Sequence, residues 1–303
     1  MQVRSTSLDL EINRIRSSLS WRATSVSGLL ADFWDIGDSK QMPENRISII
    51  TASLNAAAHI ERAIQSVAAQ TYPHIEHVII DGGSTDGTLQ IIERHRDSRG
   101  YFVSEPDRGI YSAMNKGIKA ATGDVFFFLN ADDCLCDEQV VEDVTSVFDA
   151  APDLEVVYGN LVWDLSGKMV RKKQPSTITR ASLAAATILH QTVFARKHVF
   201  DATDGFSERY KVVSDYDWMM KVFIRDGRKY RYYDRDIAVM GTQGLSWTSA
   251  DWEDERIQAM RAYFTTWEIL RYRVWPRRLQ RAIDALSRVR HSLRWDNDST
   301  VGQ

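Results

Sequence analysis

The 303-residue sequence lacks the features that mark several common classes of protein. Its only cysteines, Cys134 and Cys136, lie too close together for an ordinary disulfide and are too few for a zinc site. No run of eighteen apolar residues is present, and the N-terminus has no apolar core of the kind found in signal peptides. We therefore expect a cytoplasmic protein without a membrane span, in which the two cysteines serve packing.

The overall charge and the glycine pattern exclude further classes. A formal net charge of −3 gives no general attraction to nucleic acid, so we expect no nucleic-acid partner. Neither Gly-x-Gly-x-x-Gly nor Gly-x-x-x-x-Gly-Lys-Ser/Thr follows a predicted strand, which argues against an NAD-binding domain and a P-loop protein. With 44% apolar and 26% charged residues, the chain has material for one large domain with appendages.

Apolar strands and amphipathic helices alternate from Arg46 onward. The predicted strands are 47–50, 77–80, 101–103 and 125–129, and the helices between them are 57–69, 89–95 and 110–121. This order predicts the α/β class with a doubly wound, mostly parallel sheet. After it we expect a helix at 138–148, a strand at 154–158, a hairpin of 161–163 with 168–171, a strand at 192–195, a helix at 216–225 and a strand at 230–233.

The main domain is expected to span residues 46–247, between two helical extensions. Residues 1–45 are predicted to be an accessory extension. Residues 248–303 are predicted to be a basic amphipathic tail, since ten arginines lie between Arg256 and Arg294 against two acids. Its apolar stripe is formed by Leu279, Ile283, Leu286, Val289 and Leu293. Such a tail would either attach to an anionic membrane surface or pack on protein.

Acidic residues follow two of the predicted strands. Asp81 opens the turn Asp-Gly-Gly-Ser-Thr-Asp-Gly-Thr, where its carboxylate could accept a hydrogen bond from a nucleotide base or serve only the geometry of the turn. Asp132 and Asp133 follow a later strand, and adjacent carboxylates suit Mg²⁺ or Mn²⁺. Their alternative role is in the first turn of the next helix, where the helix dipole favours acids. Because such loops open onto a crevice, the two clusters together indicate a metal-dependent nucleotide site.

A third acidic pair, Asp215 and Asp217, lies at the start of a predicted helix. Positions i and i+2 do not share a helical face, so one acid could be a general base and the other a cap, or both could serve the helix terminus. His190 precedes the strand at 192–195 and could contact an acceptor or a diphosphate. A lone histidine in this position is more often a structural hydrogen-bonding group.

Three segments, in this order and spacing, resemble the nucleotide-sugar domain of family-2 glycosyltransferases with the GT-A fold. They are Ile49-Ile50-Thr51-Ala52-Ser53-Leu54-Asn55, Asp81-Gly82-Gly83-Ser84-Thr85-Asp86-Gly87-Thr88 and Leu129-Asn130-Ala131-Asp132-Asp133. The likeness covers about Arg46 to Trp247, and the agreement of several motifs makes it strong. Residues 107–117, the His190-Gln191 pair and residues 241–246 also resemble a bacterial subgroup that acts in surface-polysaccharide or glycolipid assembly.

The resemblance implies a role for each motif. Thr51, Asn55 and Asp81 would bind the nucleotide, and Asp132 with Asp133 would occupy the Asp-x-Asp region that holds the metal and the ribose or diphosphate. The family more often has Asp at the position of Asn130, which leaves open which of Asp132 and Asp133 ligates the metal directly. Asp215 would be the catalytic base, with Asp217 as its reserve.

The implied activity is transfer of a sugar from a nucleoside-diphosphate sugar to a hydroxyl of a saccharide or of a lipid-linked glycan, assisted by Mn²⁺ or Mg²⁺. Attack on the opposite face of the sugar would invert its anomeric centre. A lipid-linked acceptor would bring the protein to the inner face of the membrane. The alternatives are a catalytically silent sugar-nucleotide-binding subunit and a sugar nucleotidyltransferase, for which residues 51–55 lack the expected glycine-rich basic loop.

Overall fold

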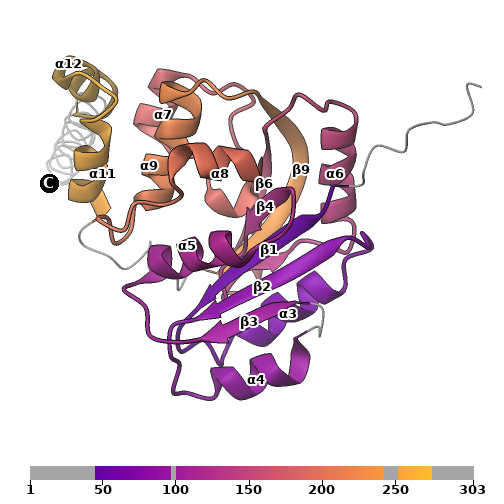
Figure 1. Ribbon diagram of the computed structural model, residues 1–303. Coiled ribbons are helices and arrows are strands. Elements are labelled where there is room, and N and C mark those ends of the chain that lie inside the picture. The colour runs from indigo at the N-terminus through magenta and orange to yellow at the C-terminus, as the bar shows by residue number, and fades with distance from the viewer. Residues whose placement is uncertain (1–44, 97–99, 242–251, 275–303) are drawn as a thin grey trace, which may run out of the picture. The chain divides into compact units, whose positions relative to one another are not determined.

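The alternating strands and helices after Arg46 form the parallel half of a nine-stranded sheet (Figure 1). In the computed structural model, which describes residues 45–96, 100–241 and 252–274, four strands lie in the order β3-β2-β1-β4 and are all parallel. The strands are β1 (Ile47–Ser53), β2 (Ile75–Asp81), β3 (Tyr101–Ser104) and β4 (Val125–Phe128), and helices α3 (Ile60–Ala68), α4 (Thr88–His95) and α5 (Ile110–Ala120) connect them. The predicted α/β class and its parallel strand series are confirmed.

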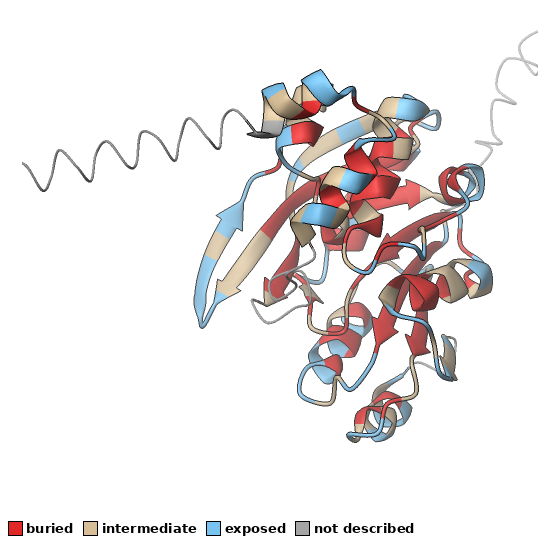
Figure 2. Cartoon of the chain, turned by 90° about the vertical axis from the view of Figure 1, so that its left-hand side faces the viewer, coloured by how far each residue is buried: buried red, intermediate tan, exposed pale blue. Residues whose placement is uncertain are grey.

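The sheet continues beyond β4 with antiparallel strands. β8 (Val193–Arg196) is antiparallel to both β4 and β6 (Val156–Leu165), and β6 pairs in parallel with β9 (Tyr230–Gly241). β5 (Cys134–Leu135) closes the order β3-β2-β1-β4-β8-β6-β9-β5. The predicted hairpin is present as β6 with β7 (Lys168–Lys172), and Figure 2 shows it exposed at the edge of the largely buried sheet.

Both faces of the sheet are covered by helices, because side chains alternate along each strand. Phe126 and Phe128 pack in the cluster formed with α5, α8 (Lys197–Thr203) and α9 (Ser214–Met220). Val125 and Phe127 point to the opposite cluster, which includes α3 and α6 (Val140–Asp149). Burial on two faces explains why β4 is a continuous apolar run rather than an alternating one.

The second half of the chain departs from the sequence predictions in length and in added elements. β9 runs to Gly241, although a strand of only 230–233 was expected, because Asp234, Arg235 and Asp236 interrupt the apolar pattern. Two of these carboxylates pair with Arg171 of β7, and β6 shifts register beside them near Tyr158 and Asn160. The short elements α7 (Arg180–Ala185), the 3-10 turn η1 (His190–Thr192) and α8 were not predicted, because segments of three to seven residues carry little periodicity.

Part of the predicted basic tail belongs to the folded domain. α11 (Trp252–Met260) and α12 (Thr266–Ile269) follow β9, and Ala259, Met260 and Phe264 are buried in the cluster that contains α9. This part of the chain therefore packs on the domain that contains α9. The apolar stripe after residue 275 and the N-terminal extension lie outside the described residues. No helix among the described residues combines the length and apolar character needed to cross a bilayer.

We expect Met260→Ala to lower the free energy of unfolding by about 2–5 kcal/mol, because Met260 is fully buried and its truncation leaves a cavity. Gln258→Ala, on the exposed side of the same helix, is the control and should change it by less than about 0.5 kcal/mol. Urea unfolding followed by circular dichroism measures both. Equal effects of the two changes would mean that α11 does not contribute to the core.

Candidate active site

A cavity of about 630 Å³ opens where β1 and β4 end and the following loops begin. This is where an open α/β sheet places its ligands, and the volume is within the range of small-molecule sites. Among the predicted site residues, the cavity wall contains Asn55, Asp132, Asp133, His190 and Asp215. Thr51, Asp81 and Asp217 do not line it.

Thr51 lies in β1 with its side chain turned away from the cavity. The residue is fully buried, and its hydroxyl shares a hydrogen bond of 3.0 Å with Nε2 of His77. Burial lowers the pKa of His77 to about 4, so the ring is neutral at pH 7. Ala52, on the opposite face of the strand, and Ser53, the last residue of β1, take part in the cavity wall. Thr51 therefore lies beside the residues of β1 that face the cavity, and its predicted contact with the nucleotide stays a prediction.

Asp81 organises the turn that follows β2. Its carboxylate is fully buried and accepts hydrogen bonds from the Gly83 and Ser84 backbone N–H groups and from the Ser84 and Ser104 hydroxyls. Asn55 joins the same turn, since its side-chain oxygen accepts from Thr85 N–H at 3.0 Å. Three of the bonds to Asp81 go to Oδ2, and Oδ1 accepts only the bond from the Ser84 hydroxyl. Asp81 therefore stabilises the turn, and its predicted recognition of a nucleotide base stays a prediction.

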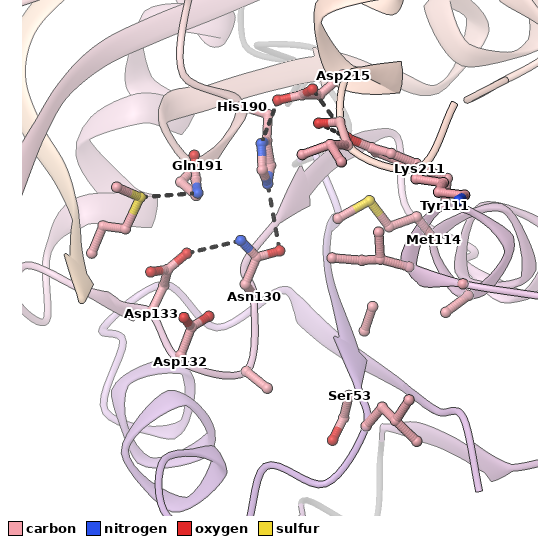
Figure 3. A pocket seen from close by; sticks show the side chains of 18 of the residues that line it. Ser53, Tyr111, Met114, Asn130, Asp132, Asp133, His190, Gln191, Lys211 and Asp215 are labelled. Atoms are coloured by element: carbon pink, nitrogen blue, oxygen red, sulfur yellow. Dashed lines mark hydrogen bonds and ion pairs between the residues drawn. The ribbon is translucent and has the colours of Figure 1, made fainter. Parts of the chain in front are cut away.

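The loop after β4 brings three polar side chains to the cavity (Figure 3). Asn130 Nδ2 donates to Asp133 Oδ2 at 3.1 Å, and Asp132 lies beside them in the wall. Asp133 is 1% exposed. Burial, followed by the neighbouring charge of Asp132, raises the pKa of the Asp133 carboxyl well above its ordinary value.

The residues of this loop fit a divalent cation. Asp133 Oδ1 is buried without a hydrogen-bond partner among the described residues, so one hard oxygen remains available. Asp132 supplies a second carboxylate. The described residues contain no cluster of three or more His, Cys, Asp and Glu side chains, but Mg²⁺ and Mn²⁺ sites commonly use one or two carboxylates and complete their shell with phosphate oxygens and water.

On the other side of the cavity His190 and Asp215 form a hydrogen-bonded pair (Figure 3). His190 Nδ1 lies 3.0 Å from Asp215 Oδ2, and Asp215 Oδ1 accepts from Tyr216 N–H at 2.8 Å. The single hydrogen of the Tyr111 hydroxyl has two acceptors within reach, Val212 O at 2.8 Å and Asp215 Oδ1 at 3.1 Å. Burial alone would raise the pKa of Asp215, but the hydrogen bond and charge of His190 and the other donors outweigh it and lower the pKa. Burial, then the Asp215 charge, raises the pKa of Tyr111 well above its ordinary value, so the phenol stays protonated.

Asp217 points away from the cavity. It is 1% exposed, accepts from the Tyr263 hydroxyl at 3.2 Å and lies 3.6 Å from Lys221 Nζ. The first turn of α9 separates positions i and i+2 by about 200° around the axis, so only Asp215 reaches the cavity. Asp217 thus connects α9 to the segment after α11, and its predicted role as the reserve base stays a prediction without a place in the cavity wall.

Several cavity residues were missed by sequence reasoning. Tyr111 and Asn130 hold the side chains of Asp215 and Asp133, and Gln191 Oε1 and Ser53 Oγ are buried without a hydrogen-bond partner in the described part of the chain. Such atoms lining a cavity are suited to a polar ligand. Tyr111 lies in a motif to which no role was given, and no local pattern would have paired it with Asp215, 104 residues away.

Comparisons with known proteins agree on one family. A model of the family described as "Glycosyl transferase family 2" matches residues 48–228. A protein of Mycobacterium bovis (strain BCG / Pasteur 1173P2), "PGL/p-HBAD biosynthesis glycosyltransferase", is 31% identical to this chain over 241 residues. The match covers 78% of this chain and 93% of the M. bovis protein. Chondroitin synthase of Escherichia coli is 31% identical over 180 residues, 58% of this chain and 26% of its own.

Solved structures share the fold. Residues 1–349 of S. aureus TarS in complex with UDP-GlcNAc align with a TM-score of 0.60 and 21% identity, over 75% of this chain and 67% of that one. The mannosyltransferase PcManGT from Pyrobaculum calidifontis, in complex with GDP-Man and Mn²⁺, aligns with a TM-score of 0.53 and 21% identity, over 72% and 63%. The chain spans 42% of the longer TarS structure.

The buried charge of Asp133 predicts a pH-dependent stability. The raised pKa of Asp133 in the folded protein means that the fold is more stable with this carboxyl protonated than with it charged. The stabilising contribution of the protonated acid is complete below the unfolded-state pKa of about 4 and is lost as the pH rises through the folded-state pKa. We expect Asp133→Asn to raise the melting temperature of the metal-free protein, with a gain that grows from pH 4 to pH 8 and reaches about 2–4 °C, or roughly 1 kcal/mol. Thermal melts in chelator measure it. Asp201→Asn, at an exposed carboxylate, is the control, and a gain that does not grow with pH would contradict the buried charge.

Proposed function

The chain belongs to glycosyl transferase family 2, and we propose that it transfers a sugar from a nucleoside-diphosphate sugar to an acceptor hydroxyl with the help of a divalent cation. One observation carries the proposal: the Asp132-Asp133 carboxylates and the His190-Asp215 pair line the same cavity at the carboxyl ends of β1 and β4. The first pair suits a cation with a diphosphate, and the second suits the proton of an attacking hydroxyl.

The donor end of the cavity is the Asp132-Asp133 loop. A cation held there would neutralise the negative charge that develops on the leaving diphosphate. Asp132 and Asp133 would hold it, and Asn130 fixes the orientation of Asp133 through one hydrogen bond. The neighbouring structures were solved with UDP-GlcNAc and with GDP-Man and Mn²⁺, which supports a nucleoside-diphosphate sugar as the class of donor.

The acceptor end is the His190-Asp215 pair. A hydroxyl placed between this pair and the sugar can lose its proton to the pair as it attacks, provided that it lies within hydrogen-bond reach. Attack from the side of this pair on a sugar whose diphosphate is bound at the Asp132-Asp133 loop would take place on the face opposite the leaving group and invert the anomeric centre.

The acceptor end also has an apolar wall, in which Met114 lies close to Tyr111 (Figure 3). Apolar and aromatic side chains of α5, of the loop before α9 and of α11 complete this wall: Ile110, Val212, Val213 and Trp252. It would accommodate the flat face of a saccharide ring or an apolar group attached to it, in agreement with a saccharide or lipid-linked acceptor. Contact of the tail with the inner face of a membrane remains a prediction, since it depends on residues after 274.

The donor proposal predicts a metal-dependent thermal shift. Among UDP, GDP, CDP and dTDP, we expect one to raise the melting temperature in the presence of Mn²⁺. At a concentration of one hundred times its Kd, this nucleotide should increase the free energy of unfolding by about 2.7 kcal/mol. The shift should disappear in chelator and in Asp132→Ala/Asp133→Ala, because the diphosphate then lacks its counter-charge. Asp201→Asn should keep it. A shift that persists without metal would contradict the cation, and no shift with any nucleotide would favour a silent or partner-dependent protein.

The inversion proposal predicts the anomer that is released first. With an α-linked donor of the preferred nucleotide and water as acceptor, we expect the β-sugar to appear before mutarotation, because water replaces the diphosphate from the opposite face. Proton NMR during the first minutes of hydrolysis measures the anomeric ratio. Initial release of the α-sugar would overturn single displacement.

A further inference from the structure

We propose that Lys211 and Arg256 select an acceptor that carries a negatively charged group, a carboxylate or a phosphate, close to the hydroxyl that receives the sugar. This inference rests on the proposed transfer reaction and adds the chemical class of its acceptor. Both cations lie in the wall of the cavity described above, and neither was singled out by the sequence.

The two cations come from segments that adjoin the acceptor end of the cavity. Lys211 precedes Val212, whose carbonyl oxygen lies 2.8 Å from the Tyr111 hydroxyl, and the same hydroxyl lies 3.1 Å from Asp215 Oδ1. Figure 3 shows Lys211 on the side of the cavity that holds Tyr111 and Asp215. Arg256 stacks on Tyr216, the residue that follows Asp215 in α9. Both positive side chains are therefore close to the predicted catalytic base.

Arg256 is a buried guanidinium held by two aromatic rings. Its side chain belongs to a residue that is 3% exposed, and its Cζ lies 4.4 Å from the centre of the Tyr216 ring and 5.1 Å from that of Trp252. Nη2 also lies 3.4 Å from the Leu183 carbonyl oxygen. Stacking uses the faces of a guanidinium, whereas its five N–H donors lie in its plane. The rings thus fix the orientation of a group whose planar fork matches the geometry of a carboxylate or phosphate.

Glu255 fixes the loop that carries Lys211 to the helix that carries Arg256. Its carboxylate accepts from the backbone N–H groups of Lys211 and Val212, each at 2.9 Å, and it immediately precedes Arg256 in α11. Glu255 itself does not line the cavity. The Lys211 side chain is exposed and forms no ion pair with the described residues. The two cations are therefore held on one connected frame beside the cavity.

The charges of the cavity wall are unevenly distributed between its ends. Lys211 and Arg256 lie near one acid of the wall, Asp215. The other acids of the wall belong to the loops that follow β3 and β4: Asp107, Asp132 and Asp133. A bound cation with a diphosphate would occupy the loop after β4, so the excess of positive side chains is at the acceptor end. Complementary charge therefore favours a negative group on the acceptor.

The alternative role of Arg256 is purely structural, as a contact between α11 and α9. Such a contact does not require a positive charge, because apolar side chains of similar volume often replace buried charged groups at no cost in stability. α11 also lies outside residues 48–228, which the family model matches. We therefore assign the arginine to recognition of the acceptor by this chain, and the ring contacts to its positioning.

The inference is tested with three probes that share one sugar ring: methyl β-D-glucoside, its 6-phosphate and methyl β-D-glucuronide. The full-length protein is first saturated with Mn²⁺ and its preferred nucleoside diphosphate, so that phosphate cannot occupy the donor end. Calorimetric titration then measures the Kd of each probe. We expect the phosphate, the carboxylate or both to bind about 10–100-fold more tightly than the neutral glycoside, because hydrogen bonds to charged groups are the stronger ones. The tighter of the two anions identifies the group.

Four variants assign the preference to its residues. Arg256→Met keeps the length of the side chain and should reduce the preference for the anion to less than about threefold, whereas Arg256→Lys keeps the charge without the fork and should retain part of it. Lys211→Met should weaken anion binding by about two- to fivefold, since its side chain is exposed. This exposed position also serves as the test if Arg256→Met does not fold. Lys197→Met, at an exposed lysine that begins α8, is the control and should have no effect.

Three results would overturn the inference. The first is that neither anion binds more tightly than the neutral glycoside. The second is that the preference survives in both Arg256→Met and Lys211→Met. The third is that these two variants lose the thermal shift with nucleoside diphosphate and Mn²⁺, which would assign the cations to the diphosphate of the donor.

Failure of the transferase assignment has a different signature. In that case the wild-type protein shows no thermal shift with any nucleoside diphosphate, and the titrations are repeated without nucleotide or metal. A preference for the anion that is then lost in Arg256→Met supports the anion site and counts against the transferase assignment alone. A nucleotide-dependent shift without any preference for the anion leaves the transferase assignment standing and removes this inference.

Discussion

The burial of β1 and β4 on both faces is the constraint on which the site depends. Strands that are covered by helices on each side cannot shift, so the loops at their carboxyl ends are held in fixed positions. Asn130, Asp132 and Asp133 leave the end of β4 directly, without a flexible connection. A polar constellation on this edge is therefore positioned by the apolar core beneath it.

Two carboxylates of the cavity are buried, but their surroundings differ. Asp215 is surrounded by donors and is stabilised in its charged form, whereas Asp133 lies beside another acid, and the pKa of its carboxyl is raised. A buried carboxylate with one amide donor, and with no ion-pair partner among the described residues, is costly, so a cation bound at Asp133 would be favourable. The two ends of one cavity thus differ in their electrostatics: the charged form of the carboxylate is stabilised at Asp215 and disfavoured at Asp133.

Much of the architecture could be predicted, because long apolar strands and helices have a periodicity that is visible locally. The parallel strand series, the β6–β7 hairpin and the helices α3 to α6 lie near their predicted ranges. The short elements α7, η1 and α8 and the continuation of β9 through Asp234 could not be predicted, because their conformation depends on contacts with distant residues such as Arg171. The family was also indicated by sequence, and the comparisons confirm it.

By itself the sequence determined the fold class, the family and which loops carry acids, because these depend on order and spacing along the chain. Only the tertiary structure decided which of these side chains share the cavity. The side chain of Thr51 points into the sheet core toward His77, and that of Asp217 points to Lys221 on the far side of α9. Tyr111, Asn130 and His190 come from three separate elements and line the same cavity. The physical reason is that direction and mutual distance are set by packing between segments far apart in sequence, whereas residue type and local period are properties of each segment alone.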